Sequence, residues 1–272
     1  MFVAGMEMST EFYRVYDGEI FPKISDVFKI SKWMHTIEPA VRYQYGPRVN
    51  QEDIPAFDEL DRIPYENQIT YGVTQRLIGK PEKEGVSSGP YEYGKLKISQ
   101  SYSLGDPIAI NSNGHGGQLS NIQGELWWNF NPYLSARWEA ELNPHRWSFD
   151  VVNVLVLAKD RREDFVQIQY RDTRGQNRQL NVIGRIKTIN PLYLYGGIYY
   201  NLMEGWMVQT IYGAEYQSQC WSLGFFVTEK GRSPDGTQRS EWKFSFYFTL
   251  LNIGSSGNRP SLMNLQSMNL GG

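Results

Sequence analysis

The chain has 272 residues, of which 40% are apolar and 21% are charged, and its formal net charge is −2 with a sequence pI near 6.0. These values exclude a disordered protein and an overall basic field that would favour nucleic acid as a partner. The single cysteine, Cys220, excludes an internal disulfide framework and any metal site built from several cysteines.

No segment matches a membrane-spanning helix or a secretory signal. Such a helix needs about 18 consecutive apolar residues, and the longest comparable run is VVNVLVLA, residues 151–158. The first residues, MFVAGMEMSTEFYRVYD, lack the charged start and apolar centre of a signal. They match the interior of a strand instead, so we expect the chain to be cut from a longer one.

Alternation of apolar and polar residues runs along the chain with hardly any helical pattern between the segments, and it predicts about 13 strands. The weaker strands are expected near residues 2–16, 32–45, 66–79, 93–103, 147–159 and 206–217. The clearer ones are expected at 122–130, 134–142, 166–170, 180–186, 192–202, 221–227 and 241–252. Between them we expect loops at 17–31, 46–65, 80–92 and 104–118, and a polar tail follows at 256–272.

Pro39 lies inside one of the alternating segments, residues 37–45. Proline has no backbone N–H and removes one hydrogen bond from a strand ladder. We therefore expect Pro39 at the end of a strand, at a sheet edge or at a bulge.

The clearest strands have one apolar face without charge and one polar face. In EWKFSFYFTL, residues 241–250, the apolar face carries an aromatic residue at four of its positions. The opposite faces of these strands carry the charged residues Arg137, Glu139, Glu141, Arg185 and Lys243. Both a β-sandwich, which buries its apolar face, and a membrane barrel, which turns it to lipid, produce this pattern.

Strand length and aromatic residues favour the barrel. A strand of about 10 residues rises roughly 33 Å and covers about 23 Å when tilted near 45°, close to the apolar band of an outer-membrane barrel. Sandwich strands are typically about 5–6 residues long. Trp128, Trp138, Tyr170 and Tyr200 lie on apolar faces, as in the aromatic girdles of barrels. The predicted fold class is an all-β, antiparallel outer-membrane β-barrel, with a soluble aromatic-rich sandwich as the alternative.

Four segments, in this order, resemble the carboxy-terminal part of the LptD family of lipopolysaccharide-assembly proteins, also called organic solvent tolerance proteins. They are HTIEPAVRYQYGP, QEDIPAFDELDRIPYENQITYGVTQRL, YGKLKISQSYSL and GAEYQSQCWSLGFFV. The resemblance covers about residues 30–255. Its most specific piece is a loop motif made of Pro55, Phe57, Asp58, Asp61 and Arg62.

The resemblance implies a barrel in the outer membrane of a Gram-negative bacterium, plugged by a lipoprotein, LptE. Members of this family receive lipopolysaccharide from a periplasmic bridge protein, through an amino-terminal domain that we do not find in this sequence. They release it through a lateral opening between the first and last strands and catalyse no covalent reaction. About 13 strands are roughly half of the family's barrel, so residues 1–255 are expected to form its carboxy-terminal half, followed by the tail at 256–272.

Within this resemblance, residues 241–252 would be one side of the lateral seam. The seam residues would be Trp242, Phe244, Phe246, Phe248 and Leu250. Their pattern also resembles the signal by which barrel proteins are recognised for insertion, and an ordinary lipid-facing strand explains it equally well. The polar-face residues Arg137, Glu139, Glu141, Arg185 and Lys243 are expected in the lumen, where the cations can meet phosphates or pair with the carboxylates.

Cys220 departs from the family pattern. The family has adjacent cysteines before the residue that matches Trp221, one of which bonds to the periplasmic domain, whereas Gln219 occupies one of these positions here. Two interpretations remain open: an interdomain or intermolecular disulfide, and a lone reduced thiol.

The sequence predicts no catalytic site, cofactor or metal site. His35, His115 and His145 lie in no ligand-spacing motif. Glu139 and Glu141 share a strand face, as a glycosidase pair would, but the neighbouring Arg137 favours lumen charges. The acidic loop at 53–66 offers carboxylates for calcium or magnesium in a spacing that matches no calcium-loop motif. The functional alternatives are a general outer-membrane porin or substrate channel and a secreted β-sandwich binding module.

Overall fold

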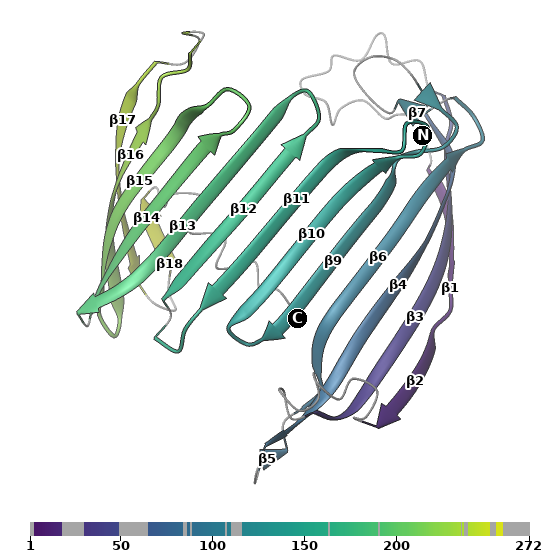
Figure 1. Cartoon of the computed structure of the whole chain (residues 1–272), viewed down its shortest axis with the longest axis horizontal. Helices are drawn as coiled ribbons and strands as arrows, with labels where there is room; N and C mark the ends of the chain where they lie inside the picture. Colours follow the sequence, from purple (N-terminus) through teal and green to yellow (C-terminus); the bar gives the residue numbers. More distant parts are fainter. Residues whose placement is uncertain are drawn as a thin grey trace. The chain divides into compact units, whose positions relative to one another are not determined.

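The computed structural model describes residues 3–17, 30–48, 65–83, 86–87, 89–106, 108–109, 116–162, 164–189, 191–234, 236, 239–250 and 254–257. Its regular structure is β-strand, as the sequence predicted (Figure 1). None of the described residues belongs to a helix long and apolar enough to cross a membrane.

The chain divides into two compact units. The first comprises Met1–Trp128 and Trp138–Val151, and the second comprises Asn129–Arg137 and Val152–Gly272. The strands of the first unit are β1 (Ala4–Ser9), β2 (Phe12–Asp17), β3 (Ile30–Gly46), β4 (Glu66–Lys83), β5 (Val86–Ser87), β6 (Tyr91–Ser103), β7 (Ile108–Ala109) and β8 (Gly116–Gly117). Three strands contribute residues to both units, namely β9 (Ile122–Asn131), β10 (Leu134–Asn143) and β11 (Ser148–Lys159).

The second unit is a meander in which each strand pairs with the next one in the chain. Its strands are β12 (Phe165–Thr173), β13 (Asn177–Ile189), β14 (Leu192–Asn201), β15 (Trp206–Gln217), β16 (Trp221–Lys230), β17 (Glu241–Leu250) and β18 (Gly254–Gly257). All of these pairs are antiparallel, and Figure 1 shows β12 to β17 side by side in chain order. Short connections make this arrangement possible, because antiparallel neighbours need only a turn between them.

The hydrogen-bonded order is β1-β3-β4-β6-β9-β10-β11-β12-β13-β14-β15-β16-β17-β18, with β2 on β3 and β5 on β4. The order begins at β1 and ends at β18, so the sheet is open within the described residues. The all-β, antiparallel architecture confirms the predicted fold class, and an open sheet agrees with part of a barrel.

Pro39 does not lie at a sheet edge or at the end of a strand, because β3 has neighbours on both sides. It pairs with Val73 of β4 on one side. On the other side the ladder stops between the pairs Ser9–Ala40 and Phe12–Ile37, which separates β1 from β2. The missing N–H of proline is thus accommodated by a break in the neighbouring strand.

Each unit has one small buried core. In the first unit Ile30, Trp33 and Tyr93 are buried together. In the second unit the inner cluster consists of Ile211, Phe226 and Tyr247, with Tyr195 and Tyr199 packed against it. Many large apolar side chains elsewhere are exposed, including several on β17. On β17 the exposed apolar residues alternate with buried ones, so this strand leaves one apolar face uncovered.

Candidate functional site

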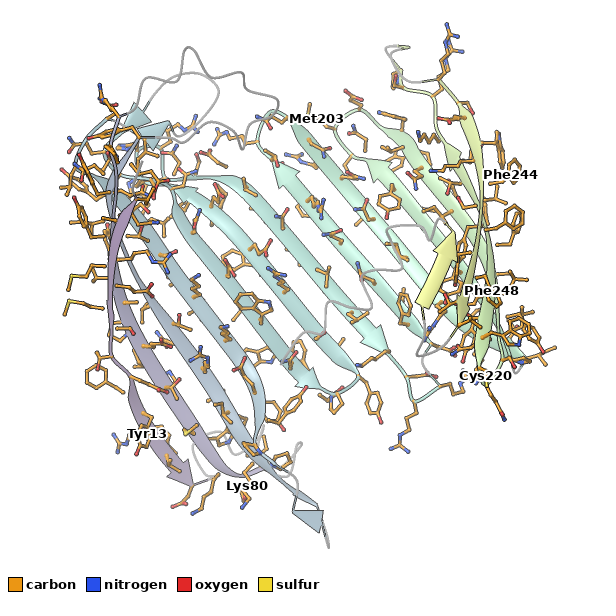
Figure 2. The ribbon with its side chains drawn as sticks, turned by 180° about the vertical axis from the view of Figure 1, so that it is seen from behind. Tyr13, Lys80, Met203, Cys220, Phe244 and Phe248 are labelled. Atoms are coloured by element: carbon orange, nitrogen blue, oxygen red, sulfur yellow. The ribbon has the colours of Figure 1, made fainter. Side chains whose placement is uncertain are left out.

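Strand β17 has the two faces that its sequence predicted. Trp242, Phe244, Phe246, Phe248 and Leu250 are exposed by 55%, 61%, 63%, 41% and 40%. The alternate residues Ser245 and Tyr247 are buried. Figure 2 shows Phe244 and Phe248 projecting from the same side of the strand. The alternation is confirmed, while the role of these residues at a seam remains a prediction.

The exposed side of β17 continues onto β16. We call the combined surface the outer aromatic surface, and it consists of Trp221, Leu223, Phe225, Trp242, Phe244, Phe246, Phe248 and Leu250. The ring centroids of Trp221 and Phe248 lie 6.1 Å apart, and those of Phe225 and Phe246 lie 4.8 Å apart. A large contiguous apolar surface that is exposed to solvent marks contact with a partner or with membrane hydrocarbon.

The opposite side of the same strands holds the inner cluster, which the sequence analysis did not single out. Phe226 lies opposite Gly213 in the β15–β16 ladder, and Tyr247 lies opposite Gly224 in the β16–β17 ladder. A Cβ atom added at either glycine would lie 2.1 Å from the facing ring. The rings therefore occupy the space that a side chain at each glycine would need.

Among the predicted lumen residues, Arg185 is the most buried, with 5% of its surface exposed. Its guanidinium lies over the rings of Phe165 and Tyr193, at 5.5 and 5.0 Å from their centroids. Nearby on the same face, the Tyr195 hydroxyl donates a hydrogen bond of 2.5 Å to Glu215 Oε2. Contacts with aromatic faces and polar groups offset the free-energy cost of removing a guanidinium from water.

The other predicted lumen residues lie on strands other than β13, which carries Arg185. Lys243 lies on β17 opposite Thr228 and is exposed. Arg137, Glu139 and Glu141 lie on β10, where Glu141 Oε2 accepts a hydrogen bond of 3.4 Å from Asn121 Nδ2. Contact of these residues with a ligand remains a prediction.

Cys220 lies exposed in the turn between β15 and β16, where the Ser218 N–H donates to the Trp221 carbonyl oxygen at 2.8 Å. Its thiol is free in the structure, and the pairing with a cysteine elsewhere stays untested. Met203 and Cys220 mark opposite ends of the second unit (Figure 2).

The connections between strands of the second unit differ in length between these two ends. The longest, residues 231–240, joins β16 to β17 at the end that also holds 202–205. The other end holds the connections 160–164, 190–191 and 218–220, none of which is longer than five residues. Cys220 therefore lies at the end of the second unit that carries the shorter connections.

The loop motif of Pro55, Phe57, Asp58, Asp61 and Arg62 lies outside the described residues, as does His115. His35 Nε2 lies 3.2 Å from Gln75 Oε1, across the β3–β4 pair. No group of three or more His, Cys, Asp or Glu side chains in the described ranges is arranged to hold a metal ion.

Comparison with known proteins gives one family and several relatives. The family LptD, described as LPS transport system D, matches residues 1–201. The LPS-assembly protein LptD of Aeromonas salmonicida is 25% identical over 90% of this chain and 33% of its own length. Proteins with the same name from Yersinia pestis and Methylococcus capsulatus are 25% and 23% identical, covering 87% and 68% of this chain and 34% and 23% of their own lengths. The chain thus spans between about a quarter and about a third of the length of these relatives.

Proposed function

The chain belongs to the LptD family, and from this we propose that it is part of an outer-membrane β-barrel that transports lipopolysaccharide and inserts it into the outer leaflet of a Gram-negative bacterium. The observation that carries the proposal beyond the family is the pair of contrasting faces on β15 to β17. One face is the uncovered outer aromatic surface, which suits hydrocarbon. The other holds buried polar groups such as Glu215 of β15 and Ser245 of β17.

Lipopolysaccharide is an amphiphile, so its carrier needs a polar path for sugars and phosphates while the acyl chains leave sideways into lipid. A lateral exit requires a strand pair weaker than its neighbours, because unpaired backbone groups in hydrocarbon are costly. We propose β17 as one side of that seam, with Trp242, Phe244, Phe246, Phe248 and Leu250 facing the lipid. On the polar side, Arg185 and Lys243 are proposed to meet phosphates, with Arg137, Glu139 and Glu141 as further lumen charges.

The partners of this segment are proposals as well. We assign to it an LptE-like lipoprotein plug and, through a domain outside this segment, a periplasmic bridge protein. Cys220 at the short-turn end is suited to a disulfide with a periplasmic domain, and the loop around Pro55–Arg62 to the extracellular side. Residues 1–255 would form barrel and 256–272 a polar tail. The proposed function requires no enzymatic step and no cofactor.

The test is replacement of the resident LptD in a depletion strain by the full-length protein that contains this segment. We expect lipopolysaccharide to reach the cell surface and the outer membrane to exclude large hydrophobic antibiotics. The protein should fractionate with the outer membrane and co-purify with the lipoprotein. Salt-dependent ion conductance without restored lipopolysaccharide would instead support a porin, and a folded protein extracted without detergent would refute the membrane assignment.

A further inference from the structure

Three exposed tyrosines of the first unit each donate a hydrogen bond from the phenol to the amide oxygen of a side chain on the next element. The bond from Tyr43 Oη is 3.1 Å long, and the bond from Tyr71 Oη is 2.6 Å long. The same direction of donation recurs from β3 to β4, from β4 to β6 and from β6 to the residues before β9. We call these residues the tyrosine–amide ladder, and its pairs are Tyr43–Asn67, Tyr71–Gln100 and Tyr102–Gln118.

The tyrosines of the ladder share one face of the sheet. Ile69 of β4 is directly opposed by Tyr43 on β3 and by Tyr102 on β6. Tyr71 follows Ile69 by two residues, so all four side chains point to the same side. The strands β3, β4 and β6 have neighbours on both edges (Figure 1). The exposure of the tyrosines is therefore a property of this face and does not come from a free strand edge.

The middle of this face is apolar. Val41 lies directly opposite Tyr71, and Val73 lies directly opposite Ile98; we call Val41, Val73 and Ile98 the apolar band. The other face of the same strands carries charges, such as the Arg76–Glu38 ion pair of 3.1 Å. The ladder face is thus the one that the proposed barrel would turn to lipid. Tyrosine suits the boundary of such a band, because its ring is apolar and its hydroxyl is polar.

The ladder lies at the end of the first unit that carries the longer connections. Tyr43 and Tyr102 are close to the ends of β3 and β6, from which the connections 47–65 and 104–121 lead. At the other end the longest connection is 18–29. Long loops of outer-membrane barrels are extracellular, and the first of these connections contains the loop already assigned to that side.

The ladder offers uncharged hydrogen-bonding groups beside exposed rings. Each phenol oxygen can still accept a hydrogen bond, and each amide NH2 group can donate two. Gln100 Nε2 donates to the Ser120 carbonyl oxygen at 3.0 Å, whereas the NH2 groups of Asn67 and Gln118 donate to no protein group among the described residues. Sugar hydroxyls both donate and accept, so they match these groups. A phospholipid phosphate only accepts and is usually bound by arginine or lysine, which the ladder does not contain.

We propose that the tyrosine–amide ladder is a binding site on the outer wall of the barrel for the sugar headgroup of lipopolysaccharide in the outer leaflet, with the acyl chains lying along the apolar band. The inference rests on the proposed function, which supplies the side of the membrane and this glycolipid. The NH2 groups of Asn67 and Gln118 donate to sugar oxygens, and the tyrosine rings contact the sugar faces. The site holds a delivered molecule beside the wall and is separate from the lumen.

A photoreactive side chain at Ile69 tests the site in the purified full-length protein. p-Benzoylphenylalanine at this position would lie between Tyr43 and Tyr102 and leave the three ladder pairs in place. Lipopolysaccharide is titrated in detergent, the sample is irradiated, and the adduct is measured on a gel. We expect the adduct to saturate and an excess of phosphatidylglycerol not to lower it. Growth in proportion to lipid concentration, or efficient competition by phosphatidylglycerol, would overturn the site.

The double variant Asn67→Leu with Gln118→Leu removes the two available NH2 groups. It should raise the half-saturating concentration of lipopolysaccharide by about fivefold or more, the loss expected for two neutral hydrogen bonds. The matched control is Gln75→Leu, which removes an amide on the same face that lies next to His35, and it should leave saturation unchanged. Equal shifts in the two variants would contradict the role of the ladder amides. Asn67→Asp with Gln118→Glu keeps the acceptors of the tyrosines without the NH2 groups, so it should give the same shift if the leucine variant does not fold.

The cross-link requires no transport, so its failure can be told from failure of the proposed function. If the full-length protein restores no surface lipopolysaccharide in the depletion strain while the Ile69 adduct saturates, the proposed function fails and the binding site stands. Restored transport with an adduct that does not saturate overturns the site alone.

Discussion

In the first unit, two rings from different strands converge on a single glycine. Trp33 of β3 lies directly opposite Gly79 of β4, and Tyr93 of β6 reaches the same glycine, 2.7 Å from where its Cβ would be. The two rings meet edge-on, with centroids 5.1 Å apart and planes at 60°. The glycine strand lies between the two strands that carry the rings.

In the second unit, each ring instead covers a glycine on the preceding strand. Phe226 of β16 covers Gly213 of β15, and Tyr247 of β17 covers Gly224 of β16. These rings stack, with centroids 5.8 Å apart and planes at 21°. In the first unit, one glycine on β4 is in contact with rings from both neighbouring strands. In the second unit, each ring covers a glycine on one neighbouring strand, and the last of these rings lies on β17. Loss of one ring should therefore loosen a particular strand pair in the second unit.

The largest expected effect is that of Phe226→Ala. This side chain is 1% exposed, and removing a buried phenylalanine costs about 3–5 kcal/mol. The measurement is the temperature at which the full-length protein in detergent changes from its folded to its unfolded electrophoretic band. Phe225→Ala is the matched control, because its neighbouring ring is exposed and points to the other face. Equal decreases in the two variants would contradict the arrangement.

Gly213→Ala should have the next largest effect. The added Cβ would lie 2.1 Å from Phe226 Cε1, and overpacking of this kind costs about 1–3 kcal/mol. Gly196→Ala, on the preceding strand β14, is the control, since no atom lies within 4 Å of its added Cβ. The effect of Gly213→Ala should shrink in a Phe226→Leu background. An unchanged effect there would show that the ring is not the obstacle.

The alternation of apolar and polar residues along single strands predicted much of this fold and the outward face of β17. The five outward residues of β17, from Trp242 to Leu250, are exposed as expected, because neighbouring side chains of a strand must point to opposite faces. Which ring covers which glycine could not be predicted, since that depends on the register between strands, and periodicity within one strand does not fix it.

Two other features escaped prediction for related reasons. Strand β18 has no alternation, so its glycines and serines match a tail, and only pairing with β17 makes it a strand. Strand β4 continues to Lys83, beyond the expected end at residue 79, because β3 supplies partners as far as Pro81 and β5 pairs with Glu82 and Lys83. In both cases a neighbouring strand overrides weak local propensity. Which edge of β17 lacks a long partner strand also depends on how strands pair, and the sequence of one strand alone does not show it.

A smaller effect is expected from the edge-on pair in the first unit. A double-mutant cycle with Trp33→Leu and Tyr93→Leu should give a coupling energy of about 0.5–1.5 kcal/mol, the usual value for an aromatic pair beyond its buried area. The same unfolding temperatures measure it. A cycle with Trp33→Leu and Tyr71→Leu serves as the control, because Tyr71 is exposed and pairs with Val41 and Gln100. Coupling of the same size in the control cycle would argue against direct ring contact.

The smallest expected effect lies outside both clusters, in the turn between β11 and β12. Partial loss of hydration raises the pKa of Asp160, but hydrogen bonds from the Arg162 side chain and from the backbone N–H groups of Asp164 and Arg162 outweigh it, so the pKa lies below its ordinary value. A carboxyl group with a lowered pKa in the folded state stabilises the fold above its unfolded-state pKa of about 4, and this contribution is lost as the pH falls through the folded-state value.

Asp160→Asn should therefore lower the unfolding temperature slightly at pH 7, and the difference from the parent protein should vanish under acid conditions. Arg162→Gln should remove a smaller part of the same contribution, because the two backbone N–H groups would still donate to Asp160 Oδ1, at 2.8 and 2.9 Å. A difference that stays constant with pH would mean that the turn is held by backbone geometry alone. Phe226→Ala provides the contrast, since removal of an uncharged ring should cost the same stability at both pH values.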